Sequence, residues 1–228
     1  MNIEITTRAE YPVEDEVLFG LFQRSFQQWR DHGIEAKCLS QNIEYFRNAT
    51  KRAVVVLAVR RKRDDGRWKI EEGRNETDGA IEDSEPVGML CIKRYNDKHA
   101  YDYYLAVAPE AKHQGVGTRM LDNVVEHLKE SGHKYLIDST SVHATWSVRW
   151  HLKNGYLIVG FGKGRKPYSD SYKFRKQIAP SLLWSGPLAP ITAKCSYFVS
   201  RTAAYLTHRS SDGALNWIGR MVKRIIRK

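Results

Sequence analysis

Two glycines that lie between a strand pattern and a helix pattern offer the clearest chemistry in this sequence. Gly115 and Gly117 follow a hydrophobic run that ends at Val107, and an amphipathic segment comes directly after them. Glycine lets backbone amides approach a ligand closely, and a helix beginning here would point its positive end at the same place. Free amides at such an end form a nest suited to a pyrophosphate. The Thr118 hydroxyl and the Lys112 ammonium could add to it.

A tight turn without any ligand would also place glycine between a strand and a helix, so the surrounding elements matter. Residues 117–131 carry the clearest helix pattern, and Gly132 follows as a stop. The apolar residues of this helix share one stripe: Met120, Leu121, Val124, Val125 and Leu128. The glycines therefore lie where a strand pattern ends and a well-defined amphipathic helix begins.

Strand and helix patterns fill the first 178 residues. We predict helices at 13–30, 40–51, 117–131 and 144–153, with Ser40 as the cap of the second, and strands at 2–7, 53–59, 87–94, 100–107, 134–142, 156–161 and 171–178. The order β-α-α-β-β-β-α-β-α-β-β predicts an α/β fold: a mixed sheet with helices on both faces. The segment 61–85 loses all periodicity and is rich in acidic residues, which predicts a solvated loop or hairpin extension.

Three segments together resemble the GNAT-type N-acetyltransferase superfamily. Residues 112–117 read KHQGVG and are similar to its motif A, which is Gln or Arg, two residues, Gly, one residue, then Gly or Ala. Residues 147–156 read SVRWHLKNGY and resemble the family's helix that ends in lysine, any residue, glycine and an aromatic residue. Residues 172–176 look like its closing strand. The resemblance covers residues 1–178 as one domain.

This resemblance implies a mostly antiparallel mixed sheet whose fourth and fifth strands splay apart around acetyl-coenzyme A. The strand edge at Leu105 and Val107 would bind the pantetheine arm, and a backbone N–H near Val107 would stabilise the oxyanion. The pyrophosphate would lie on the residues of the glycine loop, which are Lys112, Gln114, Gly115, Val116, Gly117 and Thr118. The implied activity is direct acetyl transfer to a primary amine through a tetrahedral intermediate. Acetyl-coenzyme A is the implied acyl donor, and no metal is expected.

The catalytic positions depart from the family pattern. His151 stands where the family usually has the tyrosine that protonates the leaving thiolate, and Ala144 stands where asparagine is common. Histidine can transfer a proton near neutral pH, so His151 is a candidate acid, although a polar residue on a helix face explains it equally well. The missing tyrosine and asparagine also favour a rival hypothesis, a degenerate domain that binds coenzyme A as a regulatory or scaffold module.

The general base has three candidates. Tyr101 and Asp102 lie on the strand at the level where the family often carries a glutamate, and strand alternation lets only one of them face the cleft. Asp102 has the more suitable chemistry, whereas Tyr101 matches the register better. His143, after the fifth strand, is a further candidate and equally a structural histidine.

The net charge of +11 belongs to the last third of the chain. Residues 1–161 carry 23 Lys and Arg against 24 Asp and Glu, whereas residues 162–228 carry 14 against 2. Some of the excess lies at Lys163, Arg165 and Lys166, which could face an anionic acceptor. Eight of the 14 cations lie in a basic helical extension at 179–228.

The end of this extension, residues 214–228, predicts an amphipathic helix with cations opposite an apolar face. This composition is typical of a helix on an anionic membrane surface, which would favour an acceptor at the bilayer such as an amino sugar. Packing on the core or in a homodimer explains the same face. A nucleic-acid partner is less favoured, because no recognition motif is present.

The location is predicted from what the sequence lacks. No apolar run is long enough to cross a bilayer, and the N-terminus has no secretory signal. The three cysteines, Cys38, Cys91 and Cys195, are far apart and suit a reducing compartment. We therefore expect a cytoplasmic enzyme, with peripheral membrane association as the addition that the extension suggests.

Overall fold

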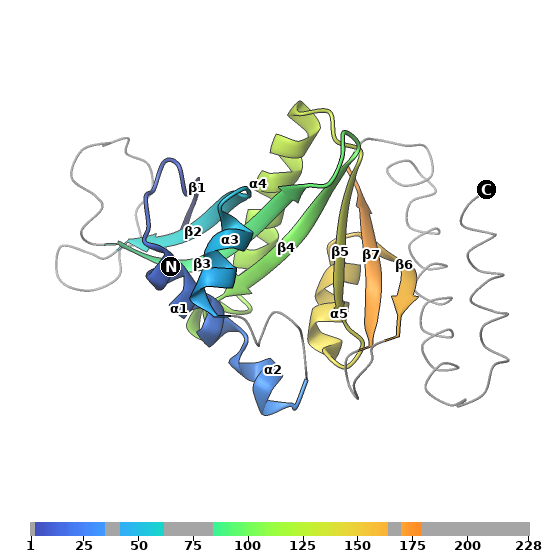
Figure 1. The fold of residues 1–228 in the computed structure, drawn as a ribbon, viewed down its shortest axis with the longest axis horizontal. Coiled ribbons are helices and arrows are strands. Elements are labelled where there is room, and N and C mark those ends of the chain that lie inside the picture. Colours follow the sequence, from blue (N-terminus) through green and yellow to red (C-terminus); the bar gives the residue numbers. More distant parts are fainter. Residues whose placement is uncertain (1–2, 35–41, 62–83, 164–169, 179–228) are drawn as a thin grey trace, which may run out of the picture. The chain divides into compact units, whose positions relative to one another are not determined.

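The computed structural model describes residues 3–34, 42–61, 84–163 and 170–178. The chain divides into two compact units, Met1–Gly132 and His133–Lys228, and each is described by itself (Figure 1). The predictions for most of the acidic segment, for Arg165 and Lys166, and for the C-terminal extension lie outside the described residues. So do Cys38 and Cys195.

The first unit is built on an antiparallel sheet. Its strands, in sheet order, are β1 (Ile3–Thr7), β2 (Val54–Arg61), β3 (Ser84–Arg94) and β4 (His99–Val107). The continuous apolar run predicted as a buried strand forms β2, whose residues 55–60 are all buried. The turn around Asn96 joins β3 to β4.

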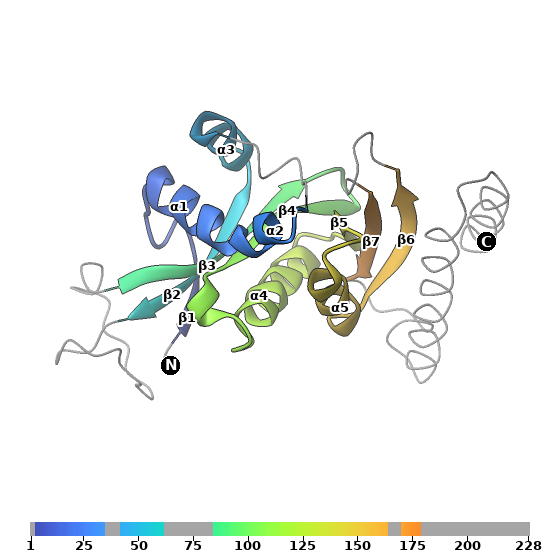
Figure 2. The same ribbon diagram turned by 90° about the horizontal axis from the view of Figure 1, so that it is seen from below.

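Helices cover both faces of this sheet (Figure 2). Helices α1 (Asp15–Ser25), α2 (Gln27–Asp31) and α3 (Ile43–Thr50) lie on one face, and α4 (Val116–Glu130) lies on the other. Phe22 of α1 and Phe46 of α3 pack on Tyr104 of β4, with ring centroids 4.9 and 5.9 Å away. The predicted mixed α/β fold with helices on both faces is confirmed.

Two helix predictions need correction. The helix predicted over 13–30 is broken at Phe26, where φ is −96° and ψ is 7°, so that it forms α1 and α2. The cap expected at Ser40 is wrong for the helix that forms, because α3 begins at Ile43 and its N-cap is Asn42. The Asn42 side chain accepts a hydrogen bond of 2.9 Å from the Tyr45 amide.

The described residues of the second unit form three paired strands and one helix. Strands β5 (Tyr135–Ser141) and β6 (Tyr156–Gly162) both pair antiparallel with β7 (Ser171–Gln177), and α5 (Thr145–Lys153) packs on β5 and β6. The helix ends before Gly155, which has the left-handed φ of 77° expected of a stop. The fourth and fifth strands, β4 and β5, belong to different units, so the splay expected between them stays a prediction.

None of the helices within the described ranges combines the length and the apolar character that a membrane crossing requires.

Candidate functional site

The glycine loop joins strand β4 to helix α4 on the first unit. The Ala108 amide donates to the Val87 carbonyl oxygen at 2.8 Å, so the chain stays fastened to β3 as β4 ends. A short 3-10 turn, Pro109–Ala111, follows. Within the described residues, His113 is the non-glycine residue with a positive φ, 63°, and Gly115 has a φ of 76°. Two left-handed residues therefore reverse the chain directly before α4 begins.

The start of α4 has the features of an anion-binding helix end. Gly115 is its N-cap and supplies no side-chain hydrogen bond, and the first turn contains no acidic residue. The amides of a first helical turn have no partner within the helix, and the dipole makes this end positive. The structure brings the predicted residues Gln114, Gly115, Val116, Gly117 and Thr118 together here. Their contact with a pyrophosphate stays a prediction.

Gly88 of β3 allows this helix end to lie close to the sheet. A Cβ atom placed on Gly88 would lie 2.9 Å from Met120 Cε and 3.1 Å from Val116 Cγ1, both on α4. A real Cβ atom essentially never lies under 3.0 Å from another side chain, so any larger residue at position 88 would force a neighbouring side chain to move. Sequence reasoning missed Gly88, because it looks like an ordinary position in a strand.

Lys112 points its ammonium toward the helices on the opposite face of the sheet. Its Nζ donates to the Ser25 carbonyl oxygen at 3.1 Å and lies 3.4 Å from Gln28 Oε1. Burial lowers the pKa of this lysine. The predicted contact between Lys112 and a phosphate stays a prediction, and in this structure the side chain already has other partners.

A β-bulge in β4 decides which way Tyr101 and Asp102 face. Cys91 of β3 pairs with Tyr104, but the next residue, Ile92, pairs with Asp102, so Tyr103 is an extra residue in β4. Directly paired residues share a face of the sheet.

The bulge therefore sets which face of the sheet each of the two candidate bases takes. Tyr101 pairs with Lys93 and shares the face of α1 and α3 with Tyr104, whereas Asp102 pairs with Ile92 on the face of α4. Asp102 is buried, with 2% of its surface exposed. Alternation does put the two residues on different faces, as the sequence predicted, but the role of either as a base stays a prediction.

The bulge also gathers a polar aromatic cluster that the sequence did not reveal. The hydroxyls of Tyr45 on α3 and Tyr103 on β4 lie 3.0 Å apart. Lys93 Nζ lies 4.1 Å from the centroid of the Tyr103 ring, and the Tyr101 ring is 5.9 Å away from it. Burial, together with the hydrogen bond to Tyr45, raises the pKa of Tyr103 to about 12. We call these four residues, Tyr45, Lys93, Tyr101 and Tyr103, the tyrosine cluster.

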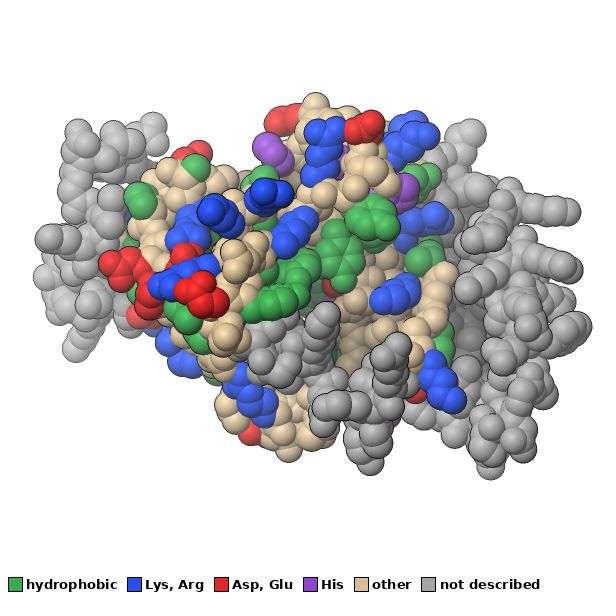
Figure 3. All heavy atoms as spheres, viewed as in Figure 1, with side chains coloured by type: hydrophobic (Ala, Val, Ile, Leu, Met, Phe, Trp, Pro, Cys, Tyr) green, Lys and Arg blue, Asp and Glu red, His purple; other side chains and the backbone are tan. Residues whose placement is uncertain are grey.

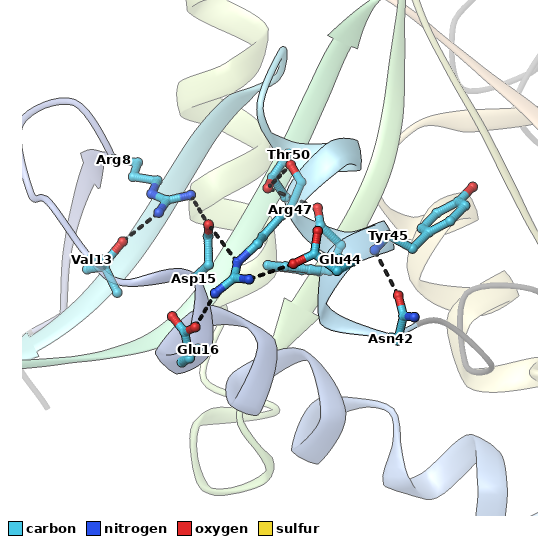
Figure 4. Close-up of polar contacts among 10 residues, drawn as sticks. Arg8, Val13, Asp15, Glu16, Asn42, Glu44, Tyr45, Arg47 and Thr50 are labelled. Carbon is cyan, nitrogen blue, oxygen red and sulfur yellow. Dashed lines mark hydrogen bonds and ion pairs between the residues drawn. The ribbon is translucent and has the colours of Figure 1, made fainter.

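An ion-pair network holds α3, which carries Tyr45, against α1 (Figure 4). Arg47 pairs with Asp15 at 3.5 Å, with Glu44 at 2.8 Å and with Glu16. Figure 3 shows the acidic and basic side chains gathered over these two helices. The Tyr45 side chain points away from the network in Figure 4, so the network can fix the helix while the phenol stays available.

His151 lies in the interior of the second unit. Its ring is 4% exposed and stacks on Phe174 with centroids 4.5 Å apart. Nε2 pairs with the Asp138 carboxylate, and Nδ1 lies 2.7 Å from the Ser147 carbonyl oxygen. Because a carbonyl oxygen only accepts, Nδ1 must donate, and both ring nitrogens therefore have partners. This is the environment of a structural histidine, and the role of His151 as an acid stays a prediction.

The other predicted positions of the second unit have simple local roles. The His143 amide lies 3.3 Å from the Ser141 hydroxyl. Ala144 is fully buried as the N-cap of α5 and provides no capping side chain. Across the described part of the chain, no three His, Cys, Asp or Glu side chains are grouped so that they could hold a metal ion.

Comparisons with known proteins agree with this geometry. Residues 57–156 match the family model described as "Acetyltransferase (GNAT) family". This match includes β4, the glycine loop, α4 and His151. No curated protein sequence matches the chain.

Solved structures of acetyltransferases share the fold. A GNAT family acetyltransferase from Elizabethkingia anophelis with acetyl-CoA bound has a TM-score of 0.51 and 16% identity, over 77% of this chain and 98% of that one. The ribosomal-protein-S18-alanine N-acetyltransferase from Escherichia coli has a TM-score of 0.54 and 13% identity, over 79% and 96%. Ard1 from Thermoplasma volcanium has a TM-score of 0.53 and 12% identity, over 79% and 100%. At these identities the likeness concerns the fold alone.

Proposed function

We propose that this protein transfers the acetyl group of acetyl-CoA to a primary amine, a proposal that the match of residues 57–156 to the GNAT acetyltransferase family model supports. The observation that carries the proposal is the glycine loop, in which left-handed His113 and Gly115 lead into the uncapped start of α4. The relative from Elizabethkingia anophelis was solved with acetyl-CoA bound, which supports the same donor here.

The chain's own groups have distinct tasks in this reaction. The amides of residues 114–118 would hold the pyrophosphate, and the β4 backbone at Leu105 and Val107 would hold the pantetheine arm. Aligning the thioester with the amine lowers the barrier, because a reaction between two separate molecules becomes one within a complex. A backbone N–H near Val107 would stabilise the oxyanion of the tetrahedral intermediate. The neutral amine attacks the thioester carbonyl carbon and forms the carbon–nitrogen bond, and collapse of the intermediate breaks the carbon–sulfur bond and releases the thiolate. The amine nitrogen loses one proton and the thiolate takes one up, so the protons balance.

We assign the acceptor to the face of the first unit that carries the tyrosine cluster. Tyr103 keeps its proton at neutral pH, so it offers a hydroxyl for hydrogen bonding and not a base. The rings of Tyr101 and Tyr103 offer apolar faces, and Lys93 adds a cation. An amine with several hydroxyl groups, such as an amino sugar, matches this combination of ring faces and hydroxyls.

Turnover of acetyl-CoA with a panel of amines, followed by mass spectrometry, tests the proposal. The panel contains amino sugars, polyamines and peptide N-termini, and we expect one class to gain an acetyl group as coenzyme A is released. Tyr103→Phe should raise the KM of the acceptor and leave that of acetyl-CoA unchanged. Tyr95→Phe is the matched control, because Tyr95 lies on the same hairpin but is 70% exposed.

The environment of His151 favours a second candidate function. Both of its ring nitrogens have partners within the second unit, so the position that the family resemblance assigns to the acid has the contacts of a structural residue. A domain that binds coenzyme A without turning it over would fit this arrangement. Coenzyme A binding without any acetylated amine in the panel would favour that function, and absence of binding would contradict both.

The proposed membrane contact of residues 214–228 rests on the sequence alone. Sedimentation with anionic liposomes tests it, with the full chain compared with a chain that lacks residues 210–228. We expect the full chain to sediment with the vesicles and the shortened chain to stay in the supernatant. Equal sedimentation of the two would remove the proposal.

A further inference from the structure

The bend between α1 and α2 changes the hydrogen-bond pattern of the helix at Ser25. In an unbroken α-helix the Trp29 amide would donate to the Ser25 carbonyl oxygen. Here it donates to the Phe26 carbonyl oxygen at 3.0 Å, and the Arg30 amide is directed to the same atom at 3.4 Å. Ser25 is only 6% exposed, and a buried carbonyl oxygen needs a hydrogen-bond donor.

Lys112 provides that partner from a point 87 residues further along the chain. Its ammonium donates to the Ser25 carbonyl oxygen at 3.1 Å and also approaches the Gln28 side chain on α2. A cation at the last turn of α1 is favoured by the helix dipole. Burial strengthens such a charged hydrogen bond, and the lowered pKa of Lys112 reports the same burial. One side chain thus contacts the end of one helix and the first turn of the next.

Because Lys112 belongs to the glycine loop, its contact with Ser25 connects this loop with helices α1 and α2. Lys112 is followed directly by left-handed His113 and then by the N-cap of α4, so its backbone belongs to the glycine loop. A lysine that only bound phosphate would be directed to the ligand. This lysine instead connects the loop with the helices that lie on the face of the tyrosine cluster.

We propose that Lys112 is a positioning residue that holds the α1–α2 bend and couples it to the glycine loop. This proposal rests on the proposed function, in which the glycine loop binds the coenzyme and the helices lie on the side of the acceptor. When coenzyme A orders the loop, it also orders the backbone that carries Lys112 and thereby the bend. By reciprocity, a fixed bend favours coenzyme binding. The order of the acceptor side then depends on whether the donor is bound.

Hydrogen exchange of the full chain, with and without coenzyme A, tests this role. Lys112→Met removes the donors and keeps most of the length, whereas Lys112→Arg keeps donors. Without ligand, the amides of residues 26–34 should exchange about tenfold faster in Lys112→Met, as expected for loss of a hydrogen bond to a charged donor. Lys112→Arg should restore most of the protection. Lys129→Met is the control, because Lys129 pairs with Glu126 in the last turns of α4.

The coupling has its own readout. Coenzyme A should slow exchange at residues 26–34 in the unsubstituted protein and should not do so in Lys112→Met. By the same reciprocity, calorimetry should show that Lys112→Met binds coenzyme A more weakly, by no more than the factor by which the coenzyme slows this exchange. Unchanged exchange in ligand-free Lys112→Met would overturn the positioning role, and a large loss of coenzyme affinity alongside it would assign the lysine to the phosphate instead. If the unsubstituted protein bound no coenzyme A, the proposed function and the coupling would fail, and the ligand-free comparison would still decide whether Lys112 holds the bend.

Discussion

His151 Nε2 forms a buried ion pair with the Asp138 carboxylate, and this pair joins helix α5 to strand β5. The side chains are 5% and 14% exposed, so water screens the pair little. The Ser147 carbonyl oxygen accepts from the other ring nitrogen. Proton transfer from this ring to a departing thiolate would require it to leave at least one partner.

Replacement of His151 tests its structural role. His151→Leu should reduce the free energy of unfolding by about 1–3 kcal/mol, because the largely enclosed Asp138 carboxylate loses one of its hydrogen-bond partners. Denaturant unfolding followed by circular dichroism measures the loss. Combining His151→Leu with Asp138→Asn should recover part of it, since the uncompensated charge is gone. A single substitution that costs almost nothing in stability but abolishes acetyl transfer would instead assign His151 to catalysis.

The hydroxyl pair of Tyr45 and Tyr103 predicts an unusual alkaline titration. The pKa of Tyr103 is raised to about 12 from 10.0, first by burial and then by the hydrogen bond to Tyr45. A pKa raised by folding gives stability that is complete below the unfolded value and is lost as the pH rises toward 12. Tyr45→Phe should therefore lower the pKa of Tyr103.

Ultraviolet absorbance of tyrosinate measures this titration. Tyr103→Phe should remove the ionisation near pH 12. If Tyr45→Phe left the pKa of Tyr103 unchanged, the hydrogen bond between the two hydroxyls would not contribute to raising it.

Periodicity in the sequence was sufficient to locate the strands and helices but not the irregularities that shape the site. Apolar residues keep helical spacing from Val17 to Trp29, so the pattern runs straight through the bend at Phe26. Likewise, the bulge at Tyr103 shifts the register within a run of aromatic residues that could face either side. Such features depend on neighbours far away in the chain, and local patterns do not contain them.

The glycine loop, too, was predictable from the sequence only in part. Gly115 was predicted as a backbone position that must approach a ligand, and its left-handed φ of 76° fits that prediction. The contact between Lys112 and Ser25 was not predictable, because nothing near either residue points to the other across 87 positions. The need for glycine at position 88 likewise arises only when α4 packs on β3.

Gly88→Ala should destabilise the first unit by about 1–3 kcal/mol, because the added methyl group overpacks the space below α4. It would meet Met120 Cε at 2.9 Å and the side chains of Ala58 and Val116 at 3.1 Å. Gly20→Ala is the matched control, since its Cβ would meet only Arg24 Nη1 at 3.9 Å. Alanine is the better helix former, so Gly20→Ala should raise stability by about 0.5–1 kcal/mol. Equal effects of the two in thermal unfolding would contradict the close packing of α4.

Calorimetric titration of coenzyme A into matched glycine variants tests the coenzyme loop most directly. Gly115 and Gly132 both have a left-handed φ, 76° and 77°, and a Cβ atom added at either position would meet open space. Alanine at either position should therefore cost a similar strain, about 1–2 kcal/mol. We predict that the unsubstituted protein and Gly132→Ala bind coenzyme A alike and that Gly115→Ala binds about tenfold more weakly, since that strain falls on the loop. Equal binding by the two variants, or no binding by the unsubstituted protein, would contradict the account.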